Sequence, residues 1–195
     1  MTFREHLELR DKHAFLSPSS YSWLRYTPEK LKTVYYNQLK KAEGTRLHAI
    51  AKELIQMGIM LPETNETLNM YVNDAIICRL KPEQPLFYSR NCYGTADAIG
   101  FDGNTLRIFD LKSGETKANM DQLNIYAALF LLEYGMELDI HSDEIEYELR
   151  IYQSQNVTIE SPHGSKIRTI MNTIVEFDKI INELEWGDRY GATNP

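Results

Sequence analysis

A run of short strands in the middle of this chain constrains its fold more than any other feature. Segments 86–91, 93–101 and 105–111 have strand-like compositions and are separated by turn residues. Asp102-Gly103-Asn104 is typical of a tight hairpin turn, because glycine and asparagine tolerate positive φ angles. The three segments therefore predict a β-meander, in which each strand lies beside the next one along the chain.

Helical patterns flank this meander. Ser17 and Pro18 are typical of a helix start, and Pro28 interrupts the short helix that follows them. Two prolines within 81–85 predict a break before the first strand, and Gly135 is expected to end the helix after the meander. Further helices are expected at 30–57, 66–80, 119–134 and 165–186, and a further strand at 145–153, with 157–160 as its extension.

This order of elements predicts a compact α/β fold with a mixed central β-sheet flanked by helices. The length of 195 residues fits one domain, and no repeat or linker divides it. Within residues 1–195 we expect an N-terminal helical part at about 17–80, a sheet and active-site core at about 86–160, and a C-terminal helix at about 165–186.

The composition favours a cytoplasmic globular protein over a membrane or secreted one. No run approaches the roughly 18 apolar residues of a membrane span, and the first residues lack the apolar stretch of a signal peptide. Cys78 and Cys92 are expected to be reduced, since nothing else indicates secretion. Two thiols are also too few for a four-cysteine zinc or iron–sulphur site.

The distribution of charge bears on nucleic-acid binding. The net charge of −7 argues against general electrostatic binding to phosphates. Residues 1–60 nevertheless carry ten Lys and Arg against six Asp and Glu, whereas the rest of the chain carries 11 against 22. A phosphate-facing surface is therefore expected toward the first 60 residues; the alternative is that these charges lie on solvated helix faces.

The candidate chemistry lies on two strands of the predicted hairpin. Asp110 and Lys112 are two residues apart, so their side chains leave the same strand face, and the hairpin brings Asp97 near them. Two carboxylates beside an ammonium suit Mg²⁺ or Mn²⁺, which can polarise a phosphodiester and activate water. Lys112 would position or deprotonate that water, or neutralise charge in the transition state. The alternative is that Asp110 and Lys112 lie on a solvent-facing strand edge. The strand is expected to end just after Lys112, at Ser113-Gly114, and functional sites are common at strand ends.

A histidine on the long predicted helix is a further candidate. Gly44 lies one turn before His48 on the same face and would give the imidazole room to reach a neighbour. The alternative is a histidine packed among apolar residues. Glu43 and Glu53 are nearby acids that would join the site or lie on the surface.

Gln122 and Tyr126 share one face of the helix that follows the meander, because they are four residues apart. An amide and a phenol can bind phosphate oxygens or orient Lys112. The alternative is a polar helix edge with a tyrosine packed into the core.

In this order, G-x-x-x-H, G-x-x-D, D-x-K and Q-x-x-x-Y, the chain resembles the RecB-like nucleases of the PD-(D/E)xK superfamily. The likeness spans most of the chain, from the serine-rich start at 17–20 to Ile151-Tyr152-Gln153. Single-domain exonucleases of the phage type are the most similar group. The resemblance implies a restriction-endonuclease-like core.

The resemblance also implies roles for the residues named above. The expected ligands of a Mg²⁺ or Mn²⁺ ion are His48, Asp97, Asp110 and the backbone carbonyl of Leu111. Lys112 would be catalytic together with Asp97 and Asp110, the last standing where many relatives carry glutamate. Gln122 and Tyr126 would support the site and contact the DNA backbone.

The chain departs from the family in its cysteines. Iron–sulphur members carry one cysteine shortly after the N-terminal helix and three near the C-terminus. Tyr26 occupies the expected first position, and residues 186–195 contain no cysteine. No iron–sulphur cluster is therefore expected.

These observations predict a metal-dependent DNA nuclease, with exonuclease as the expected mode, that acts in DNA repair, recombination or phage DNA processing. The expected partner is DNA, beside a recombination or replication protein or a second copy of the chain, and no membrane. Two alternatives remain: a non-catalytic nucleic-acid-binding or assembly subunit of the same fold, and an accessory protein whose acidic surface recruits another protein.

Overall fold

The computed structural model describes residues 14–190, with side chains described through residue 185. The chain groups into two compact units, residues 1–43 and residues 44–195. Helix α1 (Pro28–Met57) contributes residues to both units. The candidate site residues from His48 onward all belong to the second unit, whereas Glu43 belongs to the first.

The first unit contains the short 3-10 helix η2 (Pro18–Arg25). A helix start at Ser17 and Pro18 is confirmed, although Ser17 makes no side-chain capping bond and its hydroxyl pairs with Ser19 instead. The backbone carbonyl of Ser17 accepts a hydrogen bond from the Trp23 indole at 2.9 Å. This bond closes the short helix back onto its own start.

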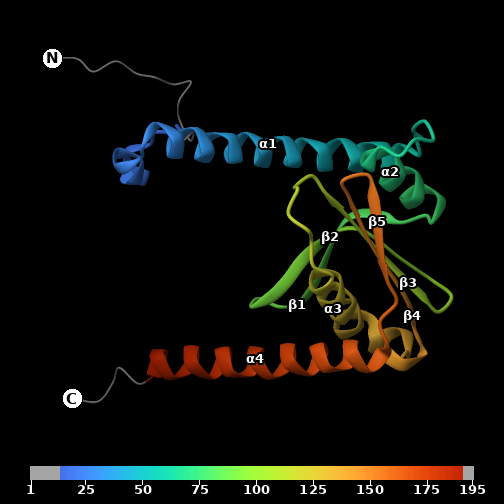
Figure 1. Cartoon of the computed structure of the whole chain (residues 1–195). Helices are drawn as coiled ribbons and strands as arrows, with labels where there is room; N and C mark the ends of the chain where they lie inside the picture. Colours follow the sequence, from blue (N-terminus) through green and yellow to red (C-terminus); the bar gives the residue numbers. More distant parts are fainter. Residues whose placement is uncertain (1–13, 191–195) are drawn as a thin grey trace, which may run out of the picture. The chain divides into compact units, whose positions relative to one another are not determined.

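The second unit is built on one five-stranded sheet, shown in Figure 1. The strands are β1 (Lys81–Ser89), β2 (Cys92–Asp102), β3 (Thr105–Lys112), β4 (Glu146–Gln153) and β5 (Asn156–Glu160). They lie in the order of the chain, with β3 and β4 parallel and the other pairs antiparallel. The predicted meander and the mixed sheet are therefore confirmed, including the turn at Gly103, whose φ is +61°.

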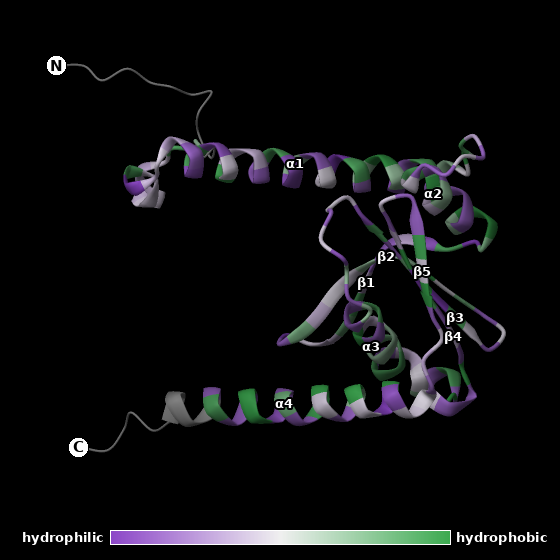
Figure 2. Cartoon of the chain, viewed as in Figure 1, coloured by the Kyte–Doolittle hydropathy of each residue, from purple (hydrophilic) through white to green (hydrophobic). Residues whose placement is uncertain are grey.

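Helices cover both faces of this sheet, as predicted. One face packs against α3 (Asp121–Leu138), which in turn contacts α4 (Gly164–Tyr190). The short helix η3 (Ser142–Glu144) lies beside α4. The other face packs against α2 (Thr67–Ile77) and the last turns of α1. Along α4, apolar and polar residues alternate over the whole described length (Figure 2).

Strand β3 is buried on both faces, as expected for a strand that pairs in parallel beneath helices. Leu106 and Ile108 belong to the core cluster formed with α3, and Phe109 and Leu111 belong to the cluster formed with α2. Asp110 follows this alternation and is itself buried. A carboxylate in such a strand is costly unless it has partners, so its surroundings define the candidate site.

The predicted break at 81–85 is wrong, because β1 already begins at Lys81. Pro82 and Pro85 both lie within the strand. This is possible because β1 is an edge strand, where a missing backbone N–H leaves no ladder bond unmade on the open side.

The predicted end of α3 at Gly135 is also wrong, because the helix continues to Leu138. Asp139 takes the left-handed conformation and donates its backbone N–H to the carbonyl of Gly135. Gly135 is buried against the backbone of Ile140, where a Cβ would lie 3.4 Å from the carbonyl oxygen. An added Cβ would therefore make an ordinary contact, and the glycine lies inside the helix and does not end it.

Cys78 and Cys92 are both free thiols. In the described part of the chain, no helix combines the length and the hydrophobicity that a membrane crossing requires.

Candidate metal centre

The site forms where β2 and β3 part. Their ladder ends at the pair Ala98–Phe109, and Asp97 is the first residue beyond it. One carboxylate oxygen of Asp97, Oδ2, accepts a hydrogen bond from the backbone N–H of Leu111 at 3.0 Å. The side chain thus takes the place of a ladder partner and links the middle of β2 to the end of β3.

Strand β2 is irregular at this point. Ala96 packs in the cluster with α3, whereas Ala98, two residues later, packs in the cluster with α2. In a regular strand, residues two apart face the same side. Asp97 therefore lies at a switch between the two faces, and its carboxylate contacts His48 of α1 and the backbone of β3.

The strand on the other side of β2 is irregular at the matching position. The β1–β2 register places Glu83 opposite Asp97, between the pairs Pro82–Ala98 and Gln84–Ala96. Glu83 has a φ of +51°, a conformation that costs a non-glycine residue on the order of 1–3 kcal/mol. Such strain persists only where the surroundings impose it, and it is frequent at functional sites.

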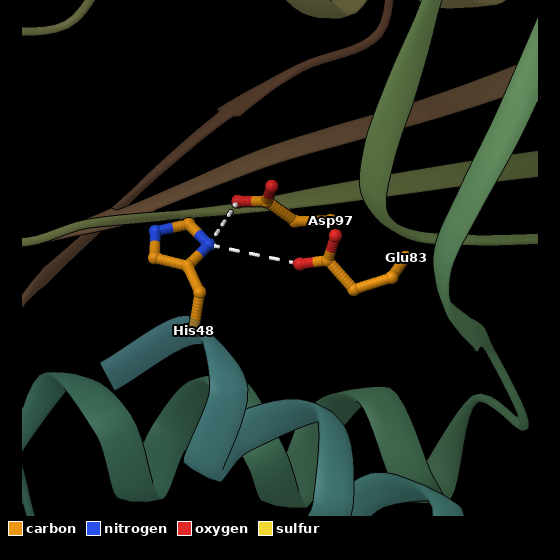
Figure 3. A group of neighbouring side chains, drawn as sticks. All are labelled: His48, Glu83 and Asp97. Carbon is orange, nitrogen blue, oxygen red and sulfur yellow. Dashed lines mark ion pairs between the residues drawn. The ribbon is translucent and has the colours of Figure 1, made fainter. Parts of the chain in front are cut away.

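His48 reaches these two acids from α1. Ala51 and Ile55 are buried on the same helix and hold this part of it against the sheet. The imidazole Nδ1 lies 3.4 Å from Asp97 Oδ2 and 4.0 Å from Glu83 Oε1 (Figure 3).

These three side chains, His48, Glu83 and Asp97, each offer a ligand atom, and the atoms all lie within 4.8 Å of one another. All three side chains are half-buried. We call them the cation group. The hydrogen bond from His48 to Asp97 raises the pKa of the imidazole against the opposing effect of burial, and the charges of Asp97 and Glu83 raise it further. The group thus has the electrostatic character of a cation-binding site.

Asp110 and Lys112 form a pair beside the cation group, as their spacing predicts. Lys112 Nζ donates to Asp110 Oδ1 at 3.0 Å. The side chain of Asp110 is only 3% exposed, and its other oxygen, Oδ2, is buried without a hydrogen-bond partner. Burial and then the charge of Asp97 raise the pKa of Asp110, and the ammonium of Lys112 opposes them only in part.

The helix after the meander supports the lysine. Lys112 Nζ also donates to Gln122 Oε1 at 3.0 Å, and Gln122 Nε2 donates to the Tyr126 hydroxyl at 3.4 Å. The ring of Tyr126 lies over Gly94, where an added Cβ would come within 3.0 Å of it. Gln122 and Tyr126 thus orient Lys112 in the structure. This was one of the two roles expected for these residues.

The loop after Lys112 is fixed by Gln153 at the end of β4. Gln153 Nε2 donates to the carbonyls of Gly114 at 2.6 Å and Thr116 at 2.7 Å, and its Oε1 accepts from the Ala118 N–H at 3.1 Å. One side chain therefore holds the loop that follows the lysine.

The same loop accounts for the glycine at position 44, which the sequence had suggested was needed to give His48 room. A Cβ at Gly44 would lie 2.6 Å from the hydroxyl oxygen of Ser113. The glycine makes room for Ser113 and not for the imidazole of His48.

The predicted site residues fall into two groups joined by Asp97. One is His48 with Asp97, and the other is the series Asp110, Lys112, Gln122 and Tyr126. Glu53 is exposed on α1, as is Glu43 in the first unit. Leu111 takes part through its backbone N–H.

Sequence reasoning missed Glu83, because its segment was interpreted as a break. The predicted strand bounds, 86–91 and 93–101, do not give this pairing. The observed register, with Leu86 opposite Gly94, brings Glu83 opposite Asp97 once β1 is extended back past residue 86. The two prolines around Glu83 hid this extension.

The residues present fit a divalent cation. Glu83 and Asp97 bring two carboxylates to His48, and Asp110, which lies outside this group of ligand atoms but near enough for its charge to act on His48, adds a third against the one ammonium of Lys112. A half-buried excess of negative charge therefore remains when His48 is neutral. Carboxylate oxygens and one imidazole are ligands of Mn²⁺ and related ions. The unpartnered Oδ2 of Asp110 is a further acceptor that a cation or its water would satisfy.

Comparisons of the chain with protein-family models, with curated proteins and with solved structures gave no match. A function is therefore proposed from the geometry of the site.

Proposed function

We propose that this chain is a divalent-cation-dependent nuclease that hydrolyses phosphodiester bonds in DNA, on a restriction-endonuclease-like core similar to that of RecB-like nucleases. One observation supports this most strongly. The Asp97 carboxylate contacts His48 of the cation group and the backbone of β3, the strand that carries Asp110 and Lys112. The Asp97 carboxylate therefore connects the candidate ligand His48 to the strand that carries Lys112.

The cation group and Asp110 are the side chains that would hold a cation, and Leu111 would add its carbonyl. A bound divalent cation supplies Lewis-acid polarisation of a phosphodiester and lowers the pKa of a bound water. His48 must be neutral to act as a ligand, so cation and proton compete for its Nδ1. Because Asp97 and Glu83 raise the pKa of His48, this competition weakens binding as the solution becomes more acidic.

Lys112 contributes the positive charge of the site. Its ammonium is held by Asp110 Oδ1 and Gln122 Oε1, both at 3.0 Å, and remains 30% exposed. A lysine held in this way can orient a water molecule or neutralise charge on the phosphoryl oxygens of the transition state. The fixed geometry matters because the side chain does not have to be ordered when substrate arrives.

The mixed ligand set favours Mn²⁺ over Mg²⁺. Mg²⁺ prefers oxygen ligands in near-ideal octahedral geometry, whereas imidazole binds later transition metals more readily. With His48 as one of the ligands, we expect activity at lower concentrations of Mn²⁺ than of Mg²⁺.

The test is degradation of linear and circular DNA with Mn²⁺, Mg²⁺ or chelator. We expect loss of linear DNA with either metal, none with chelator, and slower or no loss of circular DNA if the mode is exonucleolytic. Lys112→Ala should abolish degradation, while Lys166→Ala, which removes a surface lysine paired with Glu160, should not.

Degradation that persists in Lys112→Ala would overturn the assignment of this site. DNA binding by the wild type without degradation under any metal condition would favour the alternative of a non-catalytic nucleic-acid-binding subunit.

A further inference from the structure

The sheet face that carries the cation group continues toward the β1–β2 hairpin turn. Along β1, Leu86 packs in the cluster with α3, so Phe87, the next residue, faces the opposite side. Along β2, the position of Gly94 faces Tyr126 of α3, so Tyr93 faces away from α3 as well. His48 approaches its acids from α1, which also packs on the side opposite α3. The two aromatic rings and the cation group therefore share one face.

The two rings form an ordered and open surface. Phe87 and Tyr93 are direct cross-strand partners, with ring centroids 6.3 Å apart and planes inclined by 28°. Their residues are 54% and 69% exposed, respectively. A cross-strand aromatic pair stabilises a hairpin, but that role does not require large rings to remain open to water. Adjacent exposed rings beside a candidate site indicate a binding surface.

The spacing from the cation group suits a short stretch of extended nucleic acid. Asp97 and Tyr93 are four residues apart on β2, which corresponds to about 13 Å along the strand. A strand whose phosphate lies at the cation group can therefore place a base, a few nucleotides away, over the rings.

The net charge of the chain makes binding through phosphates alone unfavourable. With a net charge of −7, the protein has little general attraction for phosphates. Stacking of bases on aromatic rings supplies affinity that does not depend on positive charge, and it requires bases that are not already paired and stacked in a duplex.

We propose that Phe87 and Tyr93 form a base-stacking platform that binds single-stranded DNA and leads it to the cation group. The proposal rests on the proposed function, because it takes the cation group as the position of the phosphate that is cleaved. It goes further by naming single-stranded DNA as the substrate class.

The test measures binding of a fluorescent oligothymidylate of about 12 nucleotides by anisotropy, in chelator so that no strand is cut. Phe87→Ala and Tyr93→Ala should each weaken binding at least about fivefold, the low end of what loss of one stacked base produces. Phe87→Tyr should bind like the wild type, because it keeps the ring.

Two controls separate stacking from general damage. Phe177→Ala removes a ring of similar exposure, 58%, from α4 and should leave binding unchanged. A strand of the same length without bases should bind the wild type more weakly than oligothymidylate binds Phe87→Ala, because it stacks on neither ring, and Phe87→Ala should weaken its binding no further. The dependence of affinity on salt should be the same in wild type and variant, because no phosphate contact is removed.

The outcomes separate this inference from the proposed function. Unchanged oligothymidylate binding in both alanine variants overturns the platform, even if the protein degrades DNA. Ring-dependent binding of single strands by a protein that degrades no DNA overturns the nuclease and supports the platform. Tighter binding of a duplex than of the single strand overturns the platform as well.

Discussion

The carboxylate of Asp97 accepts a hydrogen bond from the backbone N–H of Leu111 at 3.0 Å, at the point where the β2–β3 ladder has ended. Asp97 therefore has two roles: it links β2 to β3 through this bond, and it belongs to the cation group. The same oxygen atom lies 3.4 Å from His48 Nδ1. Loss of the whole carboxylate therefore acts on the β2–β3 contact and on the candidate cation site together.

Two substitutions at Asp97 separate these roles. Asp97→Asn keeps an oxygen that can accept from Leu111, so we expect only a small change in the free energy of unfolding. Asp97→Ala leaves the N–H without this partner and should destabilise the protein by about 1–3 kcal/mol. Urea denaturation in chelator measures the difference, and equal destabilisation by both variants would contradict the structural role of the bond.

A second prediction concerns the buried carboxylate of Asp110. Its charged form is disfavoured by burial and by the charge of Asp97, so its pKa is raised above 3.8. Such a group stabilises the fold below its unfolded pKa, and that contribution is lost as the pH rises through the folded pKa. At pH 7 without metal, Asp110→Asn should therefore melt at a higher temperature than the wild type.

With saturating Mn²⁺ the order should reverse, because the wild type gains binding energy that the variant cannot gain. Thermal melting with chelator and with Mn²⁺ checks both halves of this prediction. A variant that is less stable than the wild type in chelator would show that the buried carboxylate is adequately paired by Lys112.

A third prediction concerns pH and a charged network away from the site. Glu148 contacts both Arg107 and Arg150, and Arg150 also donates to Asp74 at 2.7 Å. Burial alone would raise the pKa of Glu148, but hydrogen bonds from Arg150 and Arg107 outweigh it and lower the pKa below 4.5. A lowered carboxyl pKa stabilises the fold above the unfolded pKa, and this stabilisation is lost as the pH falls through the folded pKa.

Glu148→Gln should therefore cost about 1–3 kcal/mol at pH 7 and progressively less below about pH 4.5. Denaturation of wild type and variant over this range measures the change. Glu176→Gln, on the exposed surface of α4, is the matched control and should show little pH-dependent difference. A cost at pH 7 that persists unchanged in acid would contradict the charge argument.

A fourth prediction concerns Gly44 and Ser113. A Cβ at Gly44 would lie 2.6 Å from the Ser113 hydroxyl, so Gly44→Ala should displace that side chain and lose part of the gain in helix propensity. With Ser113→Ala the obstacle is absent, and adding Gly44→Ala should stabilise the protein by up to about 1 kcal/mol. The double-mutant cycle measures the coupling directly, and additive effects of the two substitutions would show that these residues do not interfere.

The order of helices and strands was predictable because apolar periodicity and turn residues are local signals. Errors arose where a residue type occurs in two settings. Pro82 and Pro85 lie in an edge strand and not in a break, and Gly135 lies inside a helix and not at its end. The parallel pairing of β3 with β4 has no local signal, because it is made after the α3 crossover. The loop contacts of Gln153 depend on that pairing and were not foreseen.

The same distinction holds for the site. The spacing of Asp110 and Lys112 predicted their pair, since both lie on one strand. The approach of His48 to Asp97 joins residues far apart in the chain and was expected from motif order. Glu83 was missed, because its placement depends on a register that runs through two prolines.

The most direct test of the central claim is a Mn²⁺ titration followed by electron paramagnetic resonance, comparing wild type, Glu83→Gln and Glu53→Gln. Glu83 lies in the cation group, whereas Glu53 is an exposed acid of α1. We expect the wild type and Glu53→Gln to bind Mn²⁺ alike and Glu83→Gln to bind it at least about tenfold more weakly, a loss of ~1.4 kcal/mol. Equal Mn²⁺ binding by all three proteins, or none by the wild type, would contradict the account.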